Sequence, residues 1–166
     1  MQSFMFWIQQ PFGDFGVQIR RDCMATSSLR VLVVENFEAF RRVVASILQK
    51  QPELQIICEV SDGLEAVQRA ETLQPDLILL DIGLPNLNGI EAAVRIRQVA
   101  PGAKIVFLTQ NSDKEIVAAA LSTGAHGYVL KKDAGRELLT GVARVLTGND
   151  FVSSGIASDS SKAKDT

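Results

Sequence analysis

The chain has 166 residues, of which 46% are hydrophobic and 22% are charged, a composition that suits one globular domain and excludes a disordered chain. Seventeen basic and nineteen acidic residues give a net charge of −2, which supplies no electrostatic footprint for nucleic acid. No apolar stretch reaches the length of a membrane span, and two cysteines are too few for a disulfide framework, so we expect a cytoplasmic protein.

The first 28 residues differ in character from the rest of the chain. They begin with an apolar stretch that lacks a basic leading region and is interrupted at Pro11, which argues against a signal peptide. Because they show no helical or strand period, we predict that residues 1–28 are a disordered extension. A start codon assigned too early would account for residues 1–23, and the intact mass of the native protein tests that idea.

Five short apolar runs follow, and segments with a helical period separate them. The runs are Leu29–Val34, Leu54–Val60, Asp76–Asp81, Lys104–Leu108 and Gly127–Leu130. Each is rich in Val, Ile or Leu and nearly continuous, as expected of strands that are covered on both faces. One predicted helical face consists of Phe37, Phe40, Val44, Ile47 and Leu48. The alternation predicts an α/β fold, namely a doubly wound parallel sheet with helices on both faces.

Capping signals mark the starts of three of the predicted helices. The pairs are Asp62 with Glu65, Asn88 with Glu91, and Ser112 with Glu115. In each pair a side chain that accepts hydrogen bonds precedes an acidic residue by three positions, as at a helix N-terminus. We therefore place a single domain at residues 29–148, followed by a polar C-terminal tail, residues 149–166, that we expect to fray.

Polar side chains follow four of the predicted strands, at the edge where a doubly wound sheet binds its ligands. They are Glu35 and Asn36 after the first strand, Asp81 after the third, Thr109 after the fourth and Lys131 after the fifth. This set suits phosphoryl transfer to Asp81, because a carboxylate is ionised at neutral pH and is a competent nucleophile. Mg²⁺ prefers carboxylate and carbonyl oxygens, so Glu35 and Asn36 are candidates to hold that ion together with Asp81. Lys131 is a candidate to pair with the transferred phosphoryl group, and the Thr109 hydroxyl to hydrogen-bond it.

Four segments of the chain resemble the receiver domain of bacterial two-component response regulators. They read RVLVVEN, DLILLDIGLPNLNG, IVFLTQ and GYVLKKDA, and they are spread in the family's order over residues 29–148. The resemblance implies a flavodoxin-like fold of five βα units with strand order 2-1-3-4-5. It also implies that Asp81 is the phosphoacceptor, filled by a sensor histidine kinase or a phosphotransfer protein. Such a domain is a signalling switch and not an enzyme, since its only catalysis acts on its own phosphoryl group.

The resemblance also assigns roles to single residues. Thr109 is the switch hydroxyl, Lys131 is the phosphate-binding lysine, and Tyr128 is the aromatic residue that moves between exposed and buried positions. The implied magnesium ligands are Glu35, Asn36, Asp81 and the backbone carbonyl of Gly83. Pro85 and Gly89 match the turn that shapes the loop after the phosphoacceptor.

Asn36 departs from the family pattern, which usually has two acidic residues after the first strand. Its amide oxygen can still coordinate a cation, but one negative charge is missing. We therefore expect weaker Mg²⁺ binding and slower phosphorylation than an aspartate would give. The missing charge also leaves a second interpretation open, a degenerate receiver that is not phosphorylated and serves as a protein–protein interaction module.

A third interpretation is an enzyme on a similar fold. An aspartate-nucleophile phosphatase usually has a second aspartate two residues after the nucleophile, where this chain has Gly83. Neither of the glycine-rich phosphate-binding motifs of nucleotide and dinucleotide sites occurs in the first predicted strand–helix turn. Both observations argue against a substrate-turnover function.

The output of the switch is expected to be protein contact. Too few residues follow the last predicted helix to form a helix-turn-helix, so we expect no direct nucleic-acid binding, and no membrane contact. The loop after Asp81 and the last helix look most like receivers that carry such an output domain, so a truncated relative of a DNA-binding regulator is an alternative. We expect a downstream protein target, and a homodimer through the fourth helix, fifth strand and fifth helix.

Overall fold

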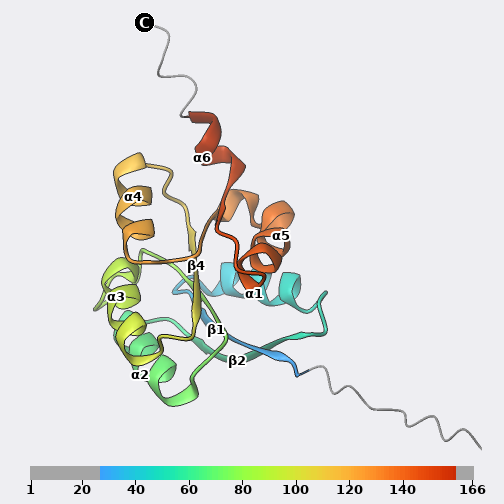
Figure 1. Cartoon of the computed structure of the whole chain (residues 1–166), viewed down its shortest axis with the longest axis vertical. Coiled ribbons are helices and arrows are strands. Elements are labelled where there is room, and N and C mark those ends of the chain that lie inside the picture. The colour runs from blue at the N-terminus through green and yellow to red at the C-terminus, as the bar shows by residue number, and fades with distance from the viewer. Residues whose placement is uncertain (1–26, 160–166) are drawn as a thin grey trace, which may run out of the picture.

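The structure is a computed structural model that describes residues 27–159 of the chain. Its centre is a parallel sheet with the strand order β2-β1-β3-β4-β5-β6 (Figure 1). The strands are β1 (Leu29–Val34), β2 (Leu54–Val60), β3 (Leu77–Leu80), β4 (Lys104–Thr109), β5 (Gly127–Leu130) and β6 (Phe151–Val152). The first five confirm the predicted strand order, whereas β6 was not predicted. Residues 1–26 of the predicted N-terminal extension lie outside the described residues.

Helices cover both faces of this sheet (Figure 1). They are α1 (Glu38–Leu48), α2 (Gly63–Leu73), α3 (Gly89–Val99), α4 (Lys114–Ser122), α5 (Ala134–Leu146) and α6 (Ser154–Asp159), with a 3-10 turn, η1 (Lys131–Asp133), before α5. Helices α1 and α5 pack on one face of the sheet, and α2, α3 and α4 pack on the other. The doubly wound arrangement is therefore confirmed. Within residues 27–159, no helix combines the length and the apolar character needed to cross a lipid bilayer.

The apolar run before Asp81 is a strand that is buried on both faces. Leu77 and Leu79 belong to the core under α1 and α5, and Ile78 and Leu80 belong to the core under α2, α3 and α4. All four side chains are fully buried. Because successive side chains of a strand point to opposite faces, the run must be apolar throughout to fill both cores. Each of these side chains contributes roughly 1.5–3 kcal/mol of burial free energy.

Two of the three predicted helix caps are confirmed. The Asp62 carboxylate accepts hydrogen bonds from the N–H groups of Leu64 and Glu65 at the start of α2. The Asn88 side chain accepts one from the N–H of Glu91 at the start of α3. The prediction for α4 was wrong by one residue.

The N-cap of α4 is Asp113, one residue after the predicted Ser112. Its carboxylate accepts a hydrogen bond from the N–H of Glu115 at 2.8 Å. Both residues are good capping residues, and an aspartate adds a negative charge at the positive end of the helix dipole. Spacing alone therefore did not separate the two candidates.

Part of the predicted C-terminal tail is ordered rather than frayed. Residues 151–152 form β6, which pairs with β5, and residues 154–159 form α6. Ser153 is fully buried and Ile156 is 7% exposed. The segment is too short and too polar to show a period of its own, so only its contacts with the sheet reveal its structure.

Gly89 allows the chain to turn tightly behind the loop that follows β3. A Cβ atom at this position would lie 2.0 Å from the carbonyl oxygen of Asp81 and 2.7 Å from the Cα of Ile82. Because backbone atoms cannot move aside as a flexible side chain can, Gly89→Ala is expected to displace this loop and to destabilise the fold by about 1–3 kcal/mol. Urea denaturation measures the loss. Gly135→Ala, which would meet nothing within 4 Å, is the control, and equal stability of the two variants would contradict the prediction.

Candidate functional site

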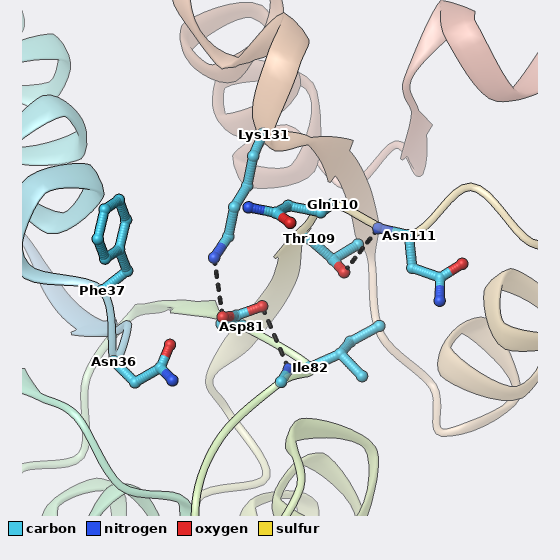
Figure 2. Close-up of a pocket in the computed structure, with 9 residues that line it drawn as sticks. Asn36, Phe37, Asp81, Ile82, Thr109, Gln110, Asn111 and Lys131 are labelled. Carbon is cyan, nitrogen blue, oxygen red and sulfur yellow. Dashed lines mark hydrogen bonds and ion pairs between the residues drawn. The ribbon is translucent and has the colours of Figure 1, made fainter.

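A pocket opens at the carboxyl edge of the sheet, where β1, β3, β4 and β5 end (Figure 2). Its lining residues are Asn36, Phe37, Asp81, Ile82, Gly83, Thr109, Gln110, Asn111 and Lys131. Five of the residues predicted to form the site therefore line one pocket: Asn36, Asp81, Gly83, Thr109 and Lys131. The remaining predicted magnesium ligand, Glu35, is buried behind them.

Asp81 lies directly after β3 and is 5% exposed. Its backbone N–H donates to the carbonyl of Val34, which extends the β1–β3 pairing to the rim of the pocket. Carboxylate Oδ2 accepts a hydrogen bond from Lys131 Nζ at 2.8 Å, and Oδ1 accepts one from the N–H of Gly83 at 3.3 Å. A buried charge is costly unless it is paired, and both oxygens of this carboxylate have partners.

Lys131 brings a positive charge between two carboxylates. It follows β5 directly, and its Nζ lies 2.7 Å from Glu35 Oε2 and 2.8 Å from Asp81 Oδ2. The ammonium group also lies 5.1 Å from the centroid of the Phe40 ring, within the range of a cation–π contact. Two carboxylates and one ammonium leave a formal charge of −1 in the pocket.

Glu35 is 1% exposed and is held on several sides. Its Oε1 accepts a hydrogen bond from the N–H of Phe37 at 2.9 Å, and its carbonyl accepts one from Arg41 Nη1 at 2.6 Å. Its Oε2 touches Lys131 as an ion pair, but among the described residues no donor completes a hydrogen bond to it. The ion pair with Lys131 is therefore the interaction that compensates the buried charge of this oxygen.

Asn36 does not cap α1, although its residue type suits that position. The N-cap of α1 is Phe37, and no side chain caps this helix. The Asn36 amide instead lies at the mouth of the pocket on the side of Asp81 (Figure 2). Within the described part of the chain, this side chain has no hydrogen-bond partner, so its oxygen is available as a ligand.

The groups around the pocket that could coordinate a metal are oxygen ligands, which suit a hard divalent cation, but they carry little negative charge. The available groups are the carboxylates of Asp81 and Glu35, the amide oxygen of Asn36 and the backbone of Gly83. All are oxygen ligands, which Mg²⁺ prefers. Residues 27–159 contain no group of three or more His, Cys, Asp or Glu side chains that could hold a metal ion. Asn36 contributes a neutral amide to the pocket, where an acidic residue would add a third carboxylate.

Thr109 and Tyr128 are linked through the backbone of Asn111. Thr109 is 3% exposed, and its Oγ1 accepts a hydrogen bond from the N–H of Asn111 at 3.2 Å. The Tyr128 hydroxyl donates to the Asn111 carbonyl at 2.8 Å. The Tyr128 ring is fully buried, and this burial raises the pKa of its hydroxyl to about 12. Only the buried one of the two predicted positions of Tyr128 is present in the structure.

Of the residues near the site that were not predicted to belong to it, Phe37, Phe40 and Asn111 have the most direct contacts with the predicted ones. Phe37 was placed on the core face of α1, but its side chain is 62% exposed at the rim of the pocket. Phe40 was also treated as core, and its contact with Lys131 carries no signal in the sequence. Asn111 joins Thr109 and Tyr128, the two predicted switch residues, through its backbone, which its residue type cannot reveal.

A doubly wound parallel sheet with two carboxylates, a lysine and a hydroxyl at its carboxyl edge defines a class of signalling domain rather than a conventional enzyme. Comparison with known families agrees, because the model of the response regulator receiver domain matches residues 31–143. The chain therefore belongs to the response regulator receiver domain family.

The most similar known proteins include transcription regulators of bacteria. The chain is 32% identical to the transcriptional regulatory protein DegU of Brevibacillus brevis over 126 residues, which are 76% of this chain and 53% of DegU. It is 31% identical to the nitrate/nitrite response regulator protein NarL of Escherichia coli (strain K12) over 123 residues, which are 74% of this chain and 57% of NarL. The chain thus spans about half the length of these relatives.

A solved structure shares the same fold. The crystal structure of a LuxR-family two-component response regulator from Aurantimonas sp. SI85-9A1 aligns with a TM-score of 0.77 and 28% sequence identity. The alignment covers 82% of this chain and 97% of that one. Sequence and structure therefore relate the chain to the NarL and LuxR regulators.

Proposed function

We propose that the chain is a cytoplasmic signalling switch that accepts a phosphoryl group on Asp81 from a sensor histidine kinase or a phosphotransfer protein. Membership of a two-component family supports the choice of donor. The main observation in favour of Asp81 as the acceptor is the position of its carboxylate, which lines the pocket and lies 2.8 Å from the Lys131 ammonium. The downstream target is a protein that distinguishes the two phosphorylation states.

In the proposed transfer, an oxygen of Asp81 forms a bond to phosphorus. The bond between phosphorus and the donor breaks, and its electron pair stays with the donor. Lys131 exchanges its contact with Asp81 for one with a phosphoryl oxygen. It can reach a phosphoryl group on Asp81 because Lys131 and Asp81 line the same pocket. The Thr109 hydroxyl accepts a hydrogen bond from the N–H of Asn111, and in the proposed transfer it turns its own proton toward a second phosphoryl oxygen.

Mg²⁺ is the proposed cofactor. Its ligands would be Glu35, Asn36, Asp81 and the backbone carbonyl of Gly83. When bound, the ion neutralises negative charge on the phosphoryl group that an anionic nucleophile must approach. Among residues 27–159 the Asn36 amide has no hydrogen-bond partner, and Glu35 Oε2 has only its ion pair with Lys131, which supports this assignment.

Asn36→Asp is expected to strengthen Mg²⁺ binding at the pocket. The change adds a third carboxylate and raises the formal negative charge of the pocket, so the Mg²⁺ concentration for half-maximal phosphorylation should fall by about tenfold or more. Titration of Mg²⁺ during phosphorylation by acetyl phosphate measures the shift. Asn149→Asp makes the same change at an exposed position away from the pocket and should leave the titration unchanged. An unaltered titration for Asn36→Asp would remove Asn36 from the metal site.

Acetyl phosphate with Mg²⁺, followed by intact-mass measurement, tests the proposed function itself. We expect the mass of one phosphoryl group to appear, to depend on Mg²⁺, and to be lost again by hydrolysis. A chain that gains nothing from acetyl phosphate, and nothing from any phosphorylated kinase, is not a phosphoryl acceptor.

Asn36 favours a second candidate function, a degenerate receiver that works as an unphosphorylated interaction module. Because residues 27–159 bring two carboxylates, Glu35 and Asp81, to the pocket, we expect a weaker cation site than three carboxylates would give. The same mass experiment separates the two functions, because the interaction module gains no phosphoryl group at any Mg²⁺ concentration.

A further inference from the structure

The C-terminal segment Phe151–Ile156 occupies the edge of the sheet that β5 would otherwise expose. The N–H of Phe151 donates to the carbonyl of His126 at 3.0 Å, and the N–H of Ser153 donates to the carbonyl of Tyr128 at 2.8 Å. A free edge strand presents unpaired backbone groups that attract another chain. Here the backbone groups at the edge of β5 are hydrogen-bonded by residues of the chain's own C-terminal segment.

Side chains anchor the same segment on both faces of the sheet. On the α5 side the Phe151 ring lies so close to Gly141 that a Cβ there would be 2.7 Å from it. On the α4 side Ile156 belongs to the same buried cluster as Tyr128 and Leu130. Figure 1 shows α6 emerging from this position between α4 and α5. The segment is therefore anchored on both faces of the sheet beside β5.

A carboxylate of α5 fixes the turn between β6 and α6. Glu137 accepts hydrogen bonds from the hydroxyls of Ser153 and Ser154, and the N–H of Ser154 donates to it at 3.3 Å. The segment thus has backbone, apolar and polar contacts with the receiver, as a bound peptide has.

The docked segment also encloses Tyr128. In the sheet register Tyr128 has Phe107 of β4 on one side and Val152 of β6 on the other. Its ring lies 6.2 Å from that of Phe107, and Ile156 packs in the same cluster. Without β6, Tyr128 would belong to an edge strand and would have solvent beside it. The C-terminal segment therefore covers Tyr128 on the side opposite β4.

We propose that Phe151–Ile156 is a detachable ligand of the face formed by α4, β5 and α5, and that while docked it holds Tyr128 in its buried position. A partner that uses this face, including a second copy of the chain, has to displace the segment first. This inference goes beyond the proposed function, because the hold on Tyr128 requires no phosphorylation.

Ile156→Asp in the full chain tests the inference, because a charge cannot remain in the apolar site of Ile156. Two readouts are needed: hydrogen exchange of the Phe151 and Ser153 amides, and O-acetylation of tyrosine by N-acetylimidazole at neutral pH. Tyr128 is the chain's only tyrosine, so a mass gain that hydroxylamine reverses reports on it alone. Val94→Asp introduces the same charge at a valine that is 47% exposed on α3 and is the matched control.

We expect slow exchange of both amides and slow acetylation in the wild type and in Val94→Asp. In Ile156→Asp both amides should lose protection and acetylation should accelerate by about tenfold or more. A chain that stops after Gly148 lacks the segment altogether, and acetylation of its tyrosine should accelerate to the same extent as in Ile156→Asp. Unprotected amides in the wild type, or unchanged acetylation of the chain that stops after Gly148, would overturn the inference. Neither result depends on phosphorylation, so failure here is distinct from failure of the phosphoacceptor function.

Discussion

Asp81→Asn is expected to abolish the uptake of a phosphoryl group from acetyl phosphate and Mg²⁺. An amide is not a nucleophile toward phosphorus at neutral pH, whereas a carboxylate is. The fold should survive, because the amide oxygen can still accept the 2.8 Å hydrogen bond from Lys131 and only the longer 3.3 Å bond from the N–H of Gly83 is lost. Lys131 also keeps its ion pair with Glu35, so no buried charge is left alone. Intact mass measures the uptake, and urea denaturation checks the fold.

Asp76→Asn is the matched control for this prediction. Asp76 also carries a carboxylate beside β3, but at the opposite end of the strand, where its Oδ2 accepts a hydrogen bond from the N–H of Arg30. This variant should take up a phosphoryl group as the wild type does. Uptake by Asp81→Asn at the wild-type level would mean that another residue is the acceptor.

Lys131→Met is expected to produce the largest loss of stability at the site. It leaves the carboxylates of Glu35 and Asp81, which are 1% and 5% exposed, without their shared cation. Removing one partner of a buried ion pair typically costs 3–5 kcal/mol, and because this pocket opens to solvent we expect about 3 kcal/mol. Urea denaturation measures the difference. Phosphorylation should also slow, since no ammonium remains to meet the phosphoryl group.

Lys132→Met is the control that separates the specific role of Lys131 from the general effect of removing a positive charge. Lys132 is the next residue and is exposed, so its loss should change stability by less than about 0.5 kcal/mol. Equal effects of the two substitutions would contradict the assignment of Lys131 to the pocket.

The sequence predicted the sheet well because its strands are nearly continuous apolar runs. The bounds of β1, β2 and β5 agree with the structure, and β3 and β4 differ by a residue at their ends. Polar residues directly after these strands pointed to the edge where Asp81 and Lys131 meet, and the structure places them 2.8 Å apart. Strand ends could be aligned from sequence because parallel strands share one direction.

Other features depend on tertiary contacts and could not be predicted. Phe37 falls on the apolar period of α1, yet it precedes the helix and points away from the core. The strand β6 has two residues, too few for any periodicity, and exists because β5 offers an unpaired edge. The buried position of Tyr128 likewise depends on neighbours from β4 and β6.

Chemical trapping of the phosphorylated residue tests the central claim most directly. Borohydride reduces an acyl phosphate of aspartate to homoserine, so peptide mass mapping after reduction identifies the residue that carried the phosphoryl group. We predict that homoserine appears at position 81 and at no other aspartate after treatment with acetyl phosphate and Mg²⁺. Reduction at a different aspartate, or a phosphoryl group that withstands borohydride, would contradict the assignment of Asp81 as the phosphoacceptor.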